Sequence, residues 1–183
     1  SCAGGGVGFN FSKIRPKGDD IQNIQWSAPG SISVMKMINE IGEHVRAGKN
    51  RRTALMSILE VSHPDFLEFL SVKLDRKELT NFNISVAINN RFISAVENDE
   101  DWHFTFAGRH NKYFCYNVER TNEKGEVDTV MVVAKDEDDA VGRADQNHKV
   151  GWTDTFANAV LSPLKAKDIW ERLLNNAVES GEP

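Results

Sequence analysis

Apolar residues recur at intervals of three or four in the stretch 31–47, the spacing of one face of an α-helix. The apolar positions are Val34, Ile38, Ile41 and Val45. Ser31 precedes them as a candidate N-cap, and Gly48 follows as a stop signal. The pattern therefore predicts an amphipathic helix over 31–47, preceded by a polar loop over 19–30.

The segment 166–180 carries the same helical period near the end of the chain. Its apolar side consists of Ile169, Trp170, Leu173, Leu174, Ala177 and Val178. Gly181 follows the last periodic residue, as is common where a helix ends. We expect an amphipathic helix here that packs one face against the rest of the fold.

Two stretches between these helices have the character of β-strands. Residues 55–61 are mostly apolar, which predicts a buried strand, and residues 82–88 alternate apolar with polar side chains. A short helix beginning at His63-Pro64-Asp65, with the proline in its first turn, should separate the strands. A further helix is expected over 89–98. Strands that alternate with helices at this spacing favour a parallel α/β architecture.

The pattern changes after residue 106. Alternating apolar residues occur at Phe114, Tyr116 and Val118. A turn signal at 122–125 separates them from a second strand signal at 127–134, which predicts a hairpin. The acidic run 136–139 then indicates the start of a helix, because negative charge is favoured at a helix amino terminus. Residues 107–160 are therefore expected to form a small α+β unit.

The glycine-rich opening, Gly4-Gly5-Gly6-Val7-Gly8, is the first candidate binding element. Glycines let backbone N–H groups approach a phosphate or a sugar closely, but they also form tight structural turns. The run lacks the Gly-Lys-Ser/Thr ending of a P-loop. Phe9-Asn10-Phe11 also disfavours the helix that a dinucleotide fingerprint requires. On the residues alone, a binding loop and a structural turn are equally open.

A basic loop, Lys49-Asn50-Arg51-Arg52, lies between the first predicted helix and the strand at 55–61. Arginine side chains in such a loop can pair with a phosphate or stack on a base. A solvated turn would have the same composition, so both interpretations stay open.

Composition narrows the class of function. The 183 residues carry a net charge of −5, which argues against a nucleic-acid surface. We find no membrane-spanning stretch and no leader, and the two cysteines, Cys2 and Cys115, do not form a disulfide scaffold. A cytoplasmic setting is therefore expected. Both ends look like cuts in a longer chain, since there is no initiator Met.

No catalytic arrangement stands out in the residue pattern. The five histidines have no paired spacing with cysteines or carboxylates, so we expect no metal site. We find no nucleophile–base pair or pair of carboxylates, and Cys115 lies in a predicted strand, where a core position is expected. The residues by themselves indicate an α/β segment suited to nucleotides or phosphates, with no catalytic residue in the segment.

Several segments, in this order, resemble the large, catalytic subunit of ribonucleotide reductases. They are residues 4–18 (GGGVGFNFSKIRPKG), 31–36 (SISVMK), 51–56 (RRTALM), His63-Pro64-Asp65, 81–86 (NFNISV), 168–171 (DIWE) and 181–183 (GEP). The likeness covers roughly 3–105 and 162–183 and is greatest to the adenosylcobalamin-dependent class II. Residues 107–160 have no counterpart in that pattern. We interpret residues 1–106 as a partial barrel, 107–160 as an inserted hairpin–helix subdomain, and 161–183 as the return to the barrel.

The resemblance implies part of the ten-stranded α/β barrel of these reductases. The enzyme reduces the 2′-hydroxyl of ribonucleoside di- or triphosphates by thiyl-radical chemistry, and its radical cysteine would lie outside this segment. The backbone of Gly5 and Gly6 would line the substrate. Lys17 and Gly18 would begin the first specificity loop, 18–30, which contacts a deoxynucleotide effector. The second specificity loop, at about 47–55, would contain Lys49, Arg51 and Arg52.

The resemblance also implies a cofactor and partners. Adenosylcobalamin would bind mainly outside this segment, and the alternative is a radical partner subunit with a di-iron or dimanganese centre. The remainder of the subunit and a second copy, as a homodimer, are the expected partners, with no nucleic acid and no membrane. By itself the segment would be inactive. The alternative function is a stand-alone (deoxy)nucleotide-binding regulatory module without catalysis, and a third possibility is a protein-interaction surface on 107–160.

Overall fold

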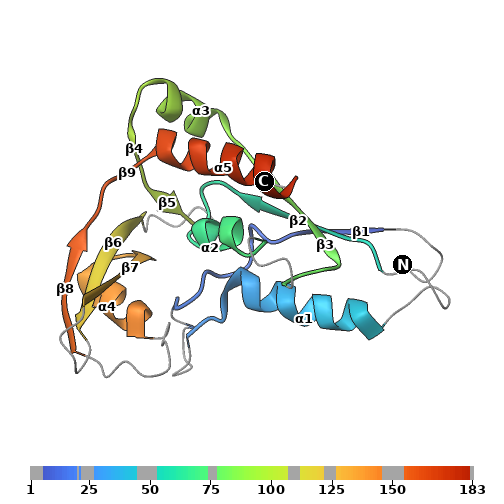
Figure 1. Ribbon diagram of the computed structural model, residues 1–183, viewed down its shortest axis with the longest axis horizontal. Helices are drawn as coiled ribbons and strands as arrows, with labels where there is room; N and C mark the ends of the chain where they lie inside the picture. The colour runs from blue at the N-terminus through green and yellow to red at the C-terminus, as the bar shows by residue number, and fades with distance from the viewer. Residues whose placement is uncertain are drawn as a thin grey trace.

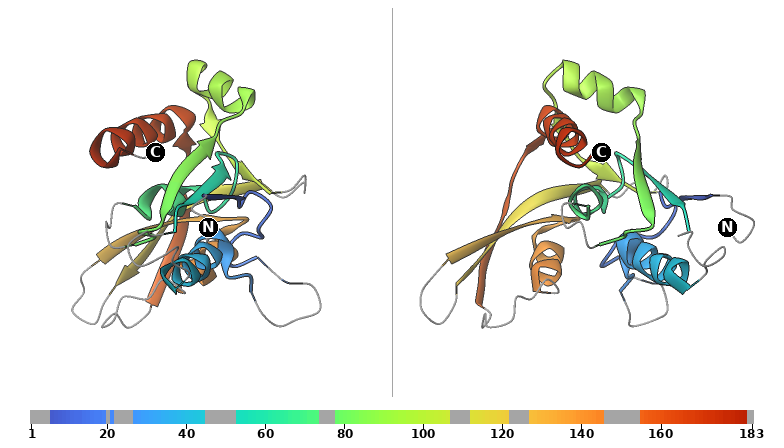
Figure 2. Two further views of the ribbon diagram at one scale, coloured as in Figure 1. Left: turned by 90° about the vertical axis from the view of Figure 1, so that its right-hand side faces the viewer. Right: turned by 45° about the vertical axis from the view of Figure 1, so that its right-hand side comes forward.

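The computed structural model describes residues 6–19, 21, 27–44, 53–73, 78–106, 112–121, 127–145 and 155–181. A three-stranded parallel sheet lies between helix α1 on one side and helix α5 on the other, and a second, antiparallel sheet extends away from them (Figure 1). Figure 2 shows the same arrangement from two further directions. Over the described ranges, no helix is both long and apolar enough to cross a membrane.

The parallel sheet has the strand order β1-β2-β3, formed by Val7–Asn10, Leu55–Glu60 and Phe82–Ala87. Val7 pairs with Leu55, and Leu55 pairs with Phe82, so the three strands begin at the same level. The two predicted strands and their parallel arrangement are confirmed. The first strand, β1, was not predicted. It has only four residues, and its conformation is stabilised by hydrogen bonds to neighbouring backbone, such as the bond from Val7 N to Ala54 O at 3.1 Å.

Helix α1 covers Gly30–His44 and differs in two respects from its prediction. It begins at Gly30, so Ser31 lies in the first turn instead of acting as the N-cap. Its buried positions include Ile32 and Met35, whereas Ile41 is 56% exposed. Val34 and Ile38 of the predicted stripe are partly buried and pack against the core, so the stripe is confirmed in part and the fully buried face is shifted toward Ile32 and Met35. Residues 45–48, including the predicted stop, lie outside the described residues.

Helix α2 covers Phe66–Ser71 and begins later than predicted. Pro64 precedes the helix instead of occupying its first turn. Asp65 occupies the N-cap position but makes no side-chain cap hydrogen bond, because its carboxylate binds elsewhere. Helix α3, Asn90–Glu97, agrees with its prediction and is capped by Asn89, whose side chain accepts from Phe92 N at 2.9 Å.

The antiparallel part confirms the predicted hairpin and helix. Strands β6 and β7, Lys112–Thr121 and Val127–Ala134, pair in antiparallel register, and α4, Glu137–Asp145, follows with three acidic residues in its first turn. Strand β8, Thr155–Leu161, was not predicted and pairs with β6 on its other edge. Strands β6, β7 and β8 thus share one sheet, with α4 beside it.

Three short strands and the last helix connect the two sheets. Strand β5, Phe104–Thr105, pairs with β6, and β4, Asp101–Trp102, pairs with β9, Leu164–Lys165. Helix α5, Ala166–Ser180, then packs near α3 and ends at Gly181 in the left-handed conformation, as predicted. The barrel implied by the resemblance is not closed within the described residues, whose strands form separate sheets.

The buried side chains form two clusters. The larger one fills the space around the parallel sheet and includes Phe11, Phe82 and Phe92, together with Tyr113 and Cys115 from the start of β6. The smaller one lies between α4 and the β6–β7 hairpin. It consists of Tyr116, Val118, Val132, Ala134, Ala140 and Ala144. The 107–160 region thus has a small core of its own, although β6 also contributes to the main core.

His63 is buried at the turn between β2 and α2, where it is 2% exposed. Its Nε2 donates to Ile14 O at 2.9 Å, and its Nδ1 accepts from Asp65 N at 3.0 Å, which requires the neutral ring. Burial lowers the pKa of His63 below its ordinary value, against the opposing attraction of Asp65. His63 is therefore a packed imidazole that joins the chain after β1 to the turn after β2.

We expect Gly30→Ala to destabilise the fold by roughly 1–3 kcal/mol. Gly30 has φ +83°, and a Cβ there would lie 2.7 Å from Lys17 Cβ and 3.0 Å from Lys17 Cα. Gly142→Ala is the matched control, because nothing lies within 4 Å of its Cβ position and α4 is helical there. The control should stabilise by about 0.5–1 kcal/mol. Thermal denaturation should show a lower melting temperature for Gly30→Ala and a higher one for Gly142→Ala. Equal shifts would contradict the close contact between Gly30 and Lys17.

Replacing His63 by Asn should flatten the dependence of stability on pH below 6.5, the ordinary histidine pKa. There the unfolded chain binds a proton that the folded chain binds less readily, so stability rises with pH between the lowered pKa and 6.5. In His63→Asn, the slope of the free energy of unfolding against pH should therefore be smaller by up to about 1.4 kcal/mol per pH unit.

Denaturant titrations at several pH values measure the slope, and measurements near pH 8, where histidines are neutral, isolate the loss of packing. The pKa of His103 is also lowered, first by partial burial and then by Arg91, so it contributes a slope that remains in the variant. An unchanged slope in His63→Asn would show that His63 is not the buried titrating group.

Candidate functional site

Two short stretches meet at the base of residues 18–30, the segment that the family resemblance predicts to be the first specificity loop. Gly18 N donates to Ala28 O at 2.9 Å, and Ala28 N donates to Asp19 O at 2.8 Å. This reciprocal pair joins the two ends of the loop. Residues 20 and 22–26 lie outside the described residues.

The buried carboxylate of Asp65 holds this base from the side of the main core. Its Oδ1 accepts from Lys17 N at 2.9 Å and its Oδ2 accepts from Ser31 N at 2.7 Å. Asp65 is 5% exposed, and a buried carboxylate needs such donors to offset its desolvation. One side chain therefore fixes the entry to the segment, the start of α1 and the start of α2.

The carboxylate of Asp19, also buried at 2% exposure, faces the antiparallel unit. Lys135 Nζ donates to its Oδ1, and Tyr113 OH donates to the same oxygen at 3.4 Å. Arg15 lies on the other side, with Nη1 at 3.6 Å from Oδ2. Burial and the adjacent Asp19 both raise the pKa of Tyr113, so the phenol stays protonated and acts as a donor.

Arg143 of α4 contacts the backbone of the same base. Its Nη1 donates to Lys17 O, and its Nε donates to Asp139 Oδ1 at 2.9 Å. The guanidinium also lies 5.7 Å from the centre of the Tyr113 ring. Gly18 permits this approach, because a Cβ there would lie 3.3 Å from Arg143 Cγ and Cζ, and its φ is +76°.

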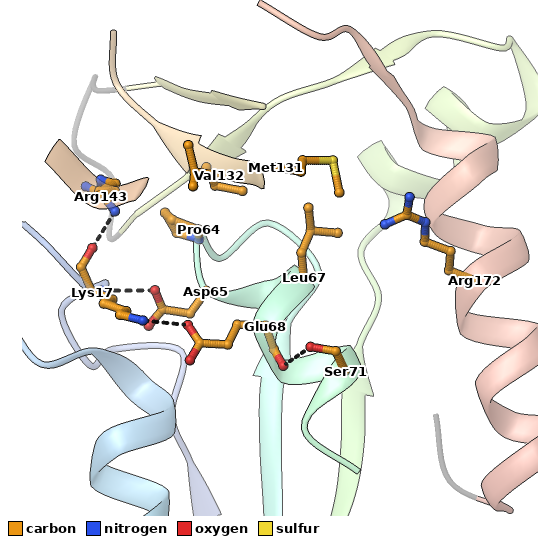
Figure 3. Close-up of a pocket in the computed structure, with 11 residues that line it drawn as sticks. Lys17, Pro64, Asp65, Leu67, Glu68, Ser71, Met131, Val132, Arg143 and Arg172 are labelled. Carbon is orange, nitrogen blue, oxygen red and sulfur yellow. Dashed lines mark hydrogen bonds and ion pairs between the residues drawn. The ribbon is translucent and has the colours of Figure 1, made fainter. Parts of the chain in front are cut away.

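A cavity of about 440 Å³ opens beside these contacts. Figure 3 shows Lys17, Asp65 and Arg143 at one end and the Arg172 side chain reaching in from α5 at the other. The apolar residues between them are Pro64, Leu67, Met131, Val132 and Val133. The cavity thus lies between α2 and β7, with positive groups at both ends and an apolar middle.

The predicted substrate residue Gly6 lies at the other end of β1. A Cβ on Gly6 would be 3.5 Å from Ala54 O, so the glycine run and the start of β2 are in contact. Gly5, Lys49, Arg51 and Arg52 lie outside the described residues, directly before these two positions in the sequence. The structure therefore brings Gly6 close to the end of the second predicted loop, and it separates Gly6 from Lys17 and Gly18 by the length of β1.

Several residues of this site were not identified by sequence reasoning. Asp19, Lys135, Tyr113 and Arg143 lie far apart in the chain, and Asp65 was noted only as part of His-Pro-Asp. No local pattern marks such partners; only the acidic start of α4 indicated that a helix would follow β7.

Cys115 and the histidines provide little chemistry of their own. Burial raises the pKa of the Cys115 thiol to about 12, so it stays protonated and acts as a core side chain, as predicted. Among the described residues, no group of three or more His, Cys, Asp or Glu side chains could hold a metal ion. Cys2 lies outside the described residues.

Proteins of similar sequence are named as ribonucleoside-diphosphate reductases or as their large subunits. The chain is 41% identical over 99 residues to a vitamin B12-dependent ribonucleoside-diphosphate reductase of Thermoplasma acidophilum, covering 54% of this chain and 13% of that protein. A relative of the same description from Mycobacterium tuberculosis is 40% identical over 96 residues, 52% of this chain and 14% of that protein. The ribonucleoside-diphosphate reductase large subunit of Caenorhabditis elegans is 26% identical over the whole chain and 21% of its own length.

The match to the family itself covers every residue. The model of the ribonucleotide reductase barrel domain matches residues 1–183, and so extends across 107–160. Whether 107–160 is an insertion relative to other members stays a prediction. The chain spans about a seventh of the length of the two B12-dependent relatives. It belongs to the ribonucleotide reductase family and lies within the barrel domain of the large subunit.

Proposed function

We propose that this chain is an internal part of a ribonucleotide reductase large subunit that supplies substrate-lining backbone and two specificity segments. In this proposal Gly5 and Gly6 line the substrate, Lys17 and Gly18 begin the effector segment, and residues 47–55 form the second specificity loop. The radical cysteine lies outside the segment. The observation that carries the proposal is the contact between Gly6 and Ala54 at the shared start of β1 and β2.

This contact has a direct functional consequence. Parallel pairing sets Val7 opposite Leu55, although about fifty residues separate them in the chain. The glycine run precedes the first of these positions in the sequence, and the basic loop precedes the second. Backbone from the glycine run can approach a sugar or phosphate closely, and arginines from the basic loop can pair with phosphate or stack on a base. A single nucleotide could therefore be contacted by both segments.

The open sheet also supports a place within a larger barrel. Within the described residues, neither outer edge of the β1-β2-β3 sheet is paired, and all-parallel sheets are normally covered on both faces. Met56 of β2 is 44% exposed and Val7 of β1 is 38% exposed. A closed barrel would pair these edges and bury these side chains. An independent binding module would leave them exposed, so we favour the barrel over the stand-alone alternative.

The base of the effector segment is built to hold its ends in place. Asp65, Asp19 and the Gly18–Ala28 pair hold both ends in place. A loop with fixed ends between two nucleotide sites can couple them by about 1–3 kcal/mol.

The proposed cofactor is adenosylcobalamin, because two of the similar proteins are named vitamin B12-dependent. When bound, it would supply the radical that starts the reaction. The described residues do not fit the whole group, since the cavity of about 440 Å³ is of mononucleotide size and a corrinoid is several times larger. The cofactor, or alternatively a partner subunit with a di-iron or dimanganese centre, would act mainly through other parts of the enzyme.

The remaining partners follow from the same proposal. The substrate is a ribonucleoside di- or triphosphate, the effector is a deoxynucleotide, and the rest of the subunit and a second copy complete the assembly in the cytoplasm. The net charge of −5 is compatible with small nucleotide ligands bound at local basic positions and argues against a nucleic-acid surface.

Replacing Arg51 and Arg52 together by Ala should weaken deoxynucleotide binding by roughly tenfold or more, because charge-assisted pairs to phosphate would be lost. Calorimetric titration of the protein with dATP, dTTP and dGTP measures the dissociation constants. Lys167→Ala removes an exposed cation on α5, away from both loops, and should leave binding unchanged.

Heats that match buffer dilution for the unaltered protein would overturn the proposed nucleotide function. Equal weakening by the Lys167 control would indicate a general charge effect instead of a specific contact. Stable folding of this chain alone, with saturable deoxynucleotide binding and no need for further strands, would favour the stand-alone module.

A further inference from the structure

We propose that Arg143 and Lys135 are positioning residues for nucleotide selection, which hold the base of the first specificity segment in one conformation. This inference rests on the proposed function of residues 18–30. It assigns a role to the 107–160 region, which would couple that region to the choice of nucleotide through the backbone of Lys17, Gly18 and Asp19.

The first line of evidence is the contact from α4. Arg143 donates through Nη1 to Lys17 O while Asp139 holds its Nε, so the guanidinium is oriented by its own helix before it contacts the segment. The Arg143 side chain is only 10% exposed, which strengthens the hydrogen bond by excluding water. A change in the position of α4 would therefore be transmitted directly to the backbone before Gly18.

The close approach at Gly18 is the second line. Arg143 lies against the α-carbon of Gly18, whose φ of +76° places it in the left-handed region. This conformation is strained for residues with a side chain, and a Cβ there would lie 3.3 Å from Arg143 Cγ and Cζ, so the arginine would have to shift. The segment thus turns at the point where the arginine contacts it.

The third line is the contact of Lys135, which lies between β7 and α4. Its ammonium binds the Asp19 carboxylate, and Tyr113 of β6 donates to the same oxygen. Asp19 in turn accepts, through its backbone carbonyl, the hydrogen bond from Ala28 that closes the segment. Lys135 therefore acts on the residue that joins the two ends of the loop.

The contacts of Arg143 and Lys135 with the segment base differ from close core packing, and we infer that they can be released and reformed. Helix α4 has its apolar contacts in the smaller core, with Ala140 and Ala144 against the β6–β7 hairpin. Its contacts with the segment base are polar, and the cavity of about 440 Å³ separates β7 from α2 beside them. Asp65, by contrast, holds the same base from the close-packed main core. The segment is thus fixed on one side and adjustable on the other.

Hydrogen exchange of the full protein that contains this chain, without nucleotide, tests the first half of the proposal. Arg143→Ala should speed exchange of the Gly18 and Ala28 amides by roughly tenfold, as expected when a charge-assisted bond that stabilises the closed base is lost. Lys167→Ala is the control, because Lys167 is an exposed cation on α5 that does not line the cavity. It should leave both amides unchanged.

Two further variants guard against a simple loss of folding. Lys135→Met keeps the side-chain length while Tyr113 and Arg15 still face Asp19, and should speed the same amides while the amides of β2 and β3 keep their protection. Arg143→Lys keeps a donor for Lys17 O and should restore part of the protection. Unchanged exchange in both Arg143→Ala and Lys135→Met would overturn the proposal.

Nucleotide selectivity tests the second half. The ratios of the dissociation constants for dATP, dTTP and dGTP should change by about threefold or more in Arg143→Ala and Lys135→Met, and stay constant in Lys167→Ala. Faster exchange with unchanged ratios would overturn the role in selection. Absence of deoxynucleotide binding by the unaltered protein would overturn the proposed function instead, and the exchange result would still decide whether the two residues hold the segment.

Discussion

The buried carboxylate of Asp65 is the constraint on which the arrangement of the first half of the chain depends. It accepts backbone hydrogen bonds from Lys17 and Ser31, which lie 48 and 34 positions away in the sequence. Without these donors, its desolvation would cost several kcal/mol, so the fold is most stable when the segment after β1, the start of α1 and the turn before α2 meet at this point. His63 also stabilises this turn, through the hydrogen bond from its Nε2 to Ile14 O.

Because β1 and β2 pair in parallel, the two ends of β1 contact different parts of the chain. Its amino end lies against Ala54 at the start of β2, where Gly6 and Val7 are in contact with that strand. Its carboxyl end leads through Phe11 to Lys17 and Gly18, which contact Asp65 and Arg143. Under the proposed function, the first end would serve the substrate and the second the effector. One short strand, held by its neighbour, connects these two places.

The antiparallel region is joined to this framework in two ways. Tyr113 and Cys115 at the start of β6 are buried in the main core, which anchors the sheet, whereas α4 meets the segment base through polar contacts of Arg143 and Lys135. Apolar packing resists displacement because any gap loses contacts. The polar contacts of α4, by contrast, depend on two side chains that lie beside the cavity. The region is therefore well attached but can still adjust where it meets the loop.

The sequence alone determined the elements with a strong local period: β3, α3, the β6–β7 hairpin, the start of α4 and the terminal helix. It also pointed to Gly6, Lys17 and Gly18 through a family resemblance that the barrel-domain match confirms. Tertiary structure decided the rest. Strands β1 and β8 exist because partners pair with them, the buried face of α1 was set by the sheet beneath it, and Arg143 meets Lys17 across 126 positions. Contacts of that range leave no periodic trace in the chain, because their free energy depends on burial and geometry that arise only after folding.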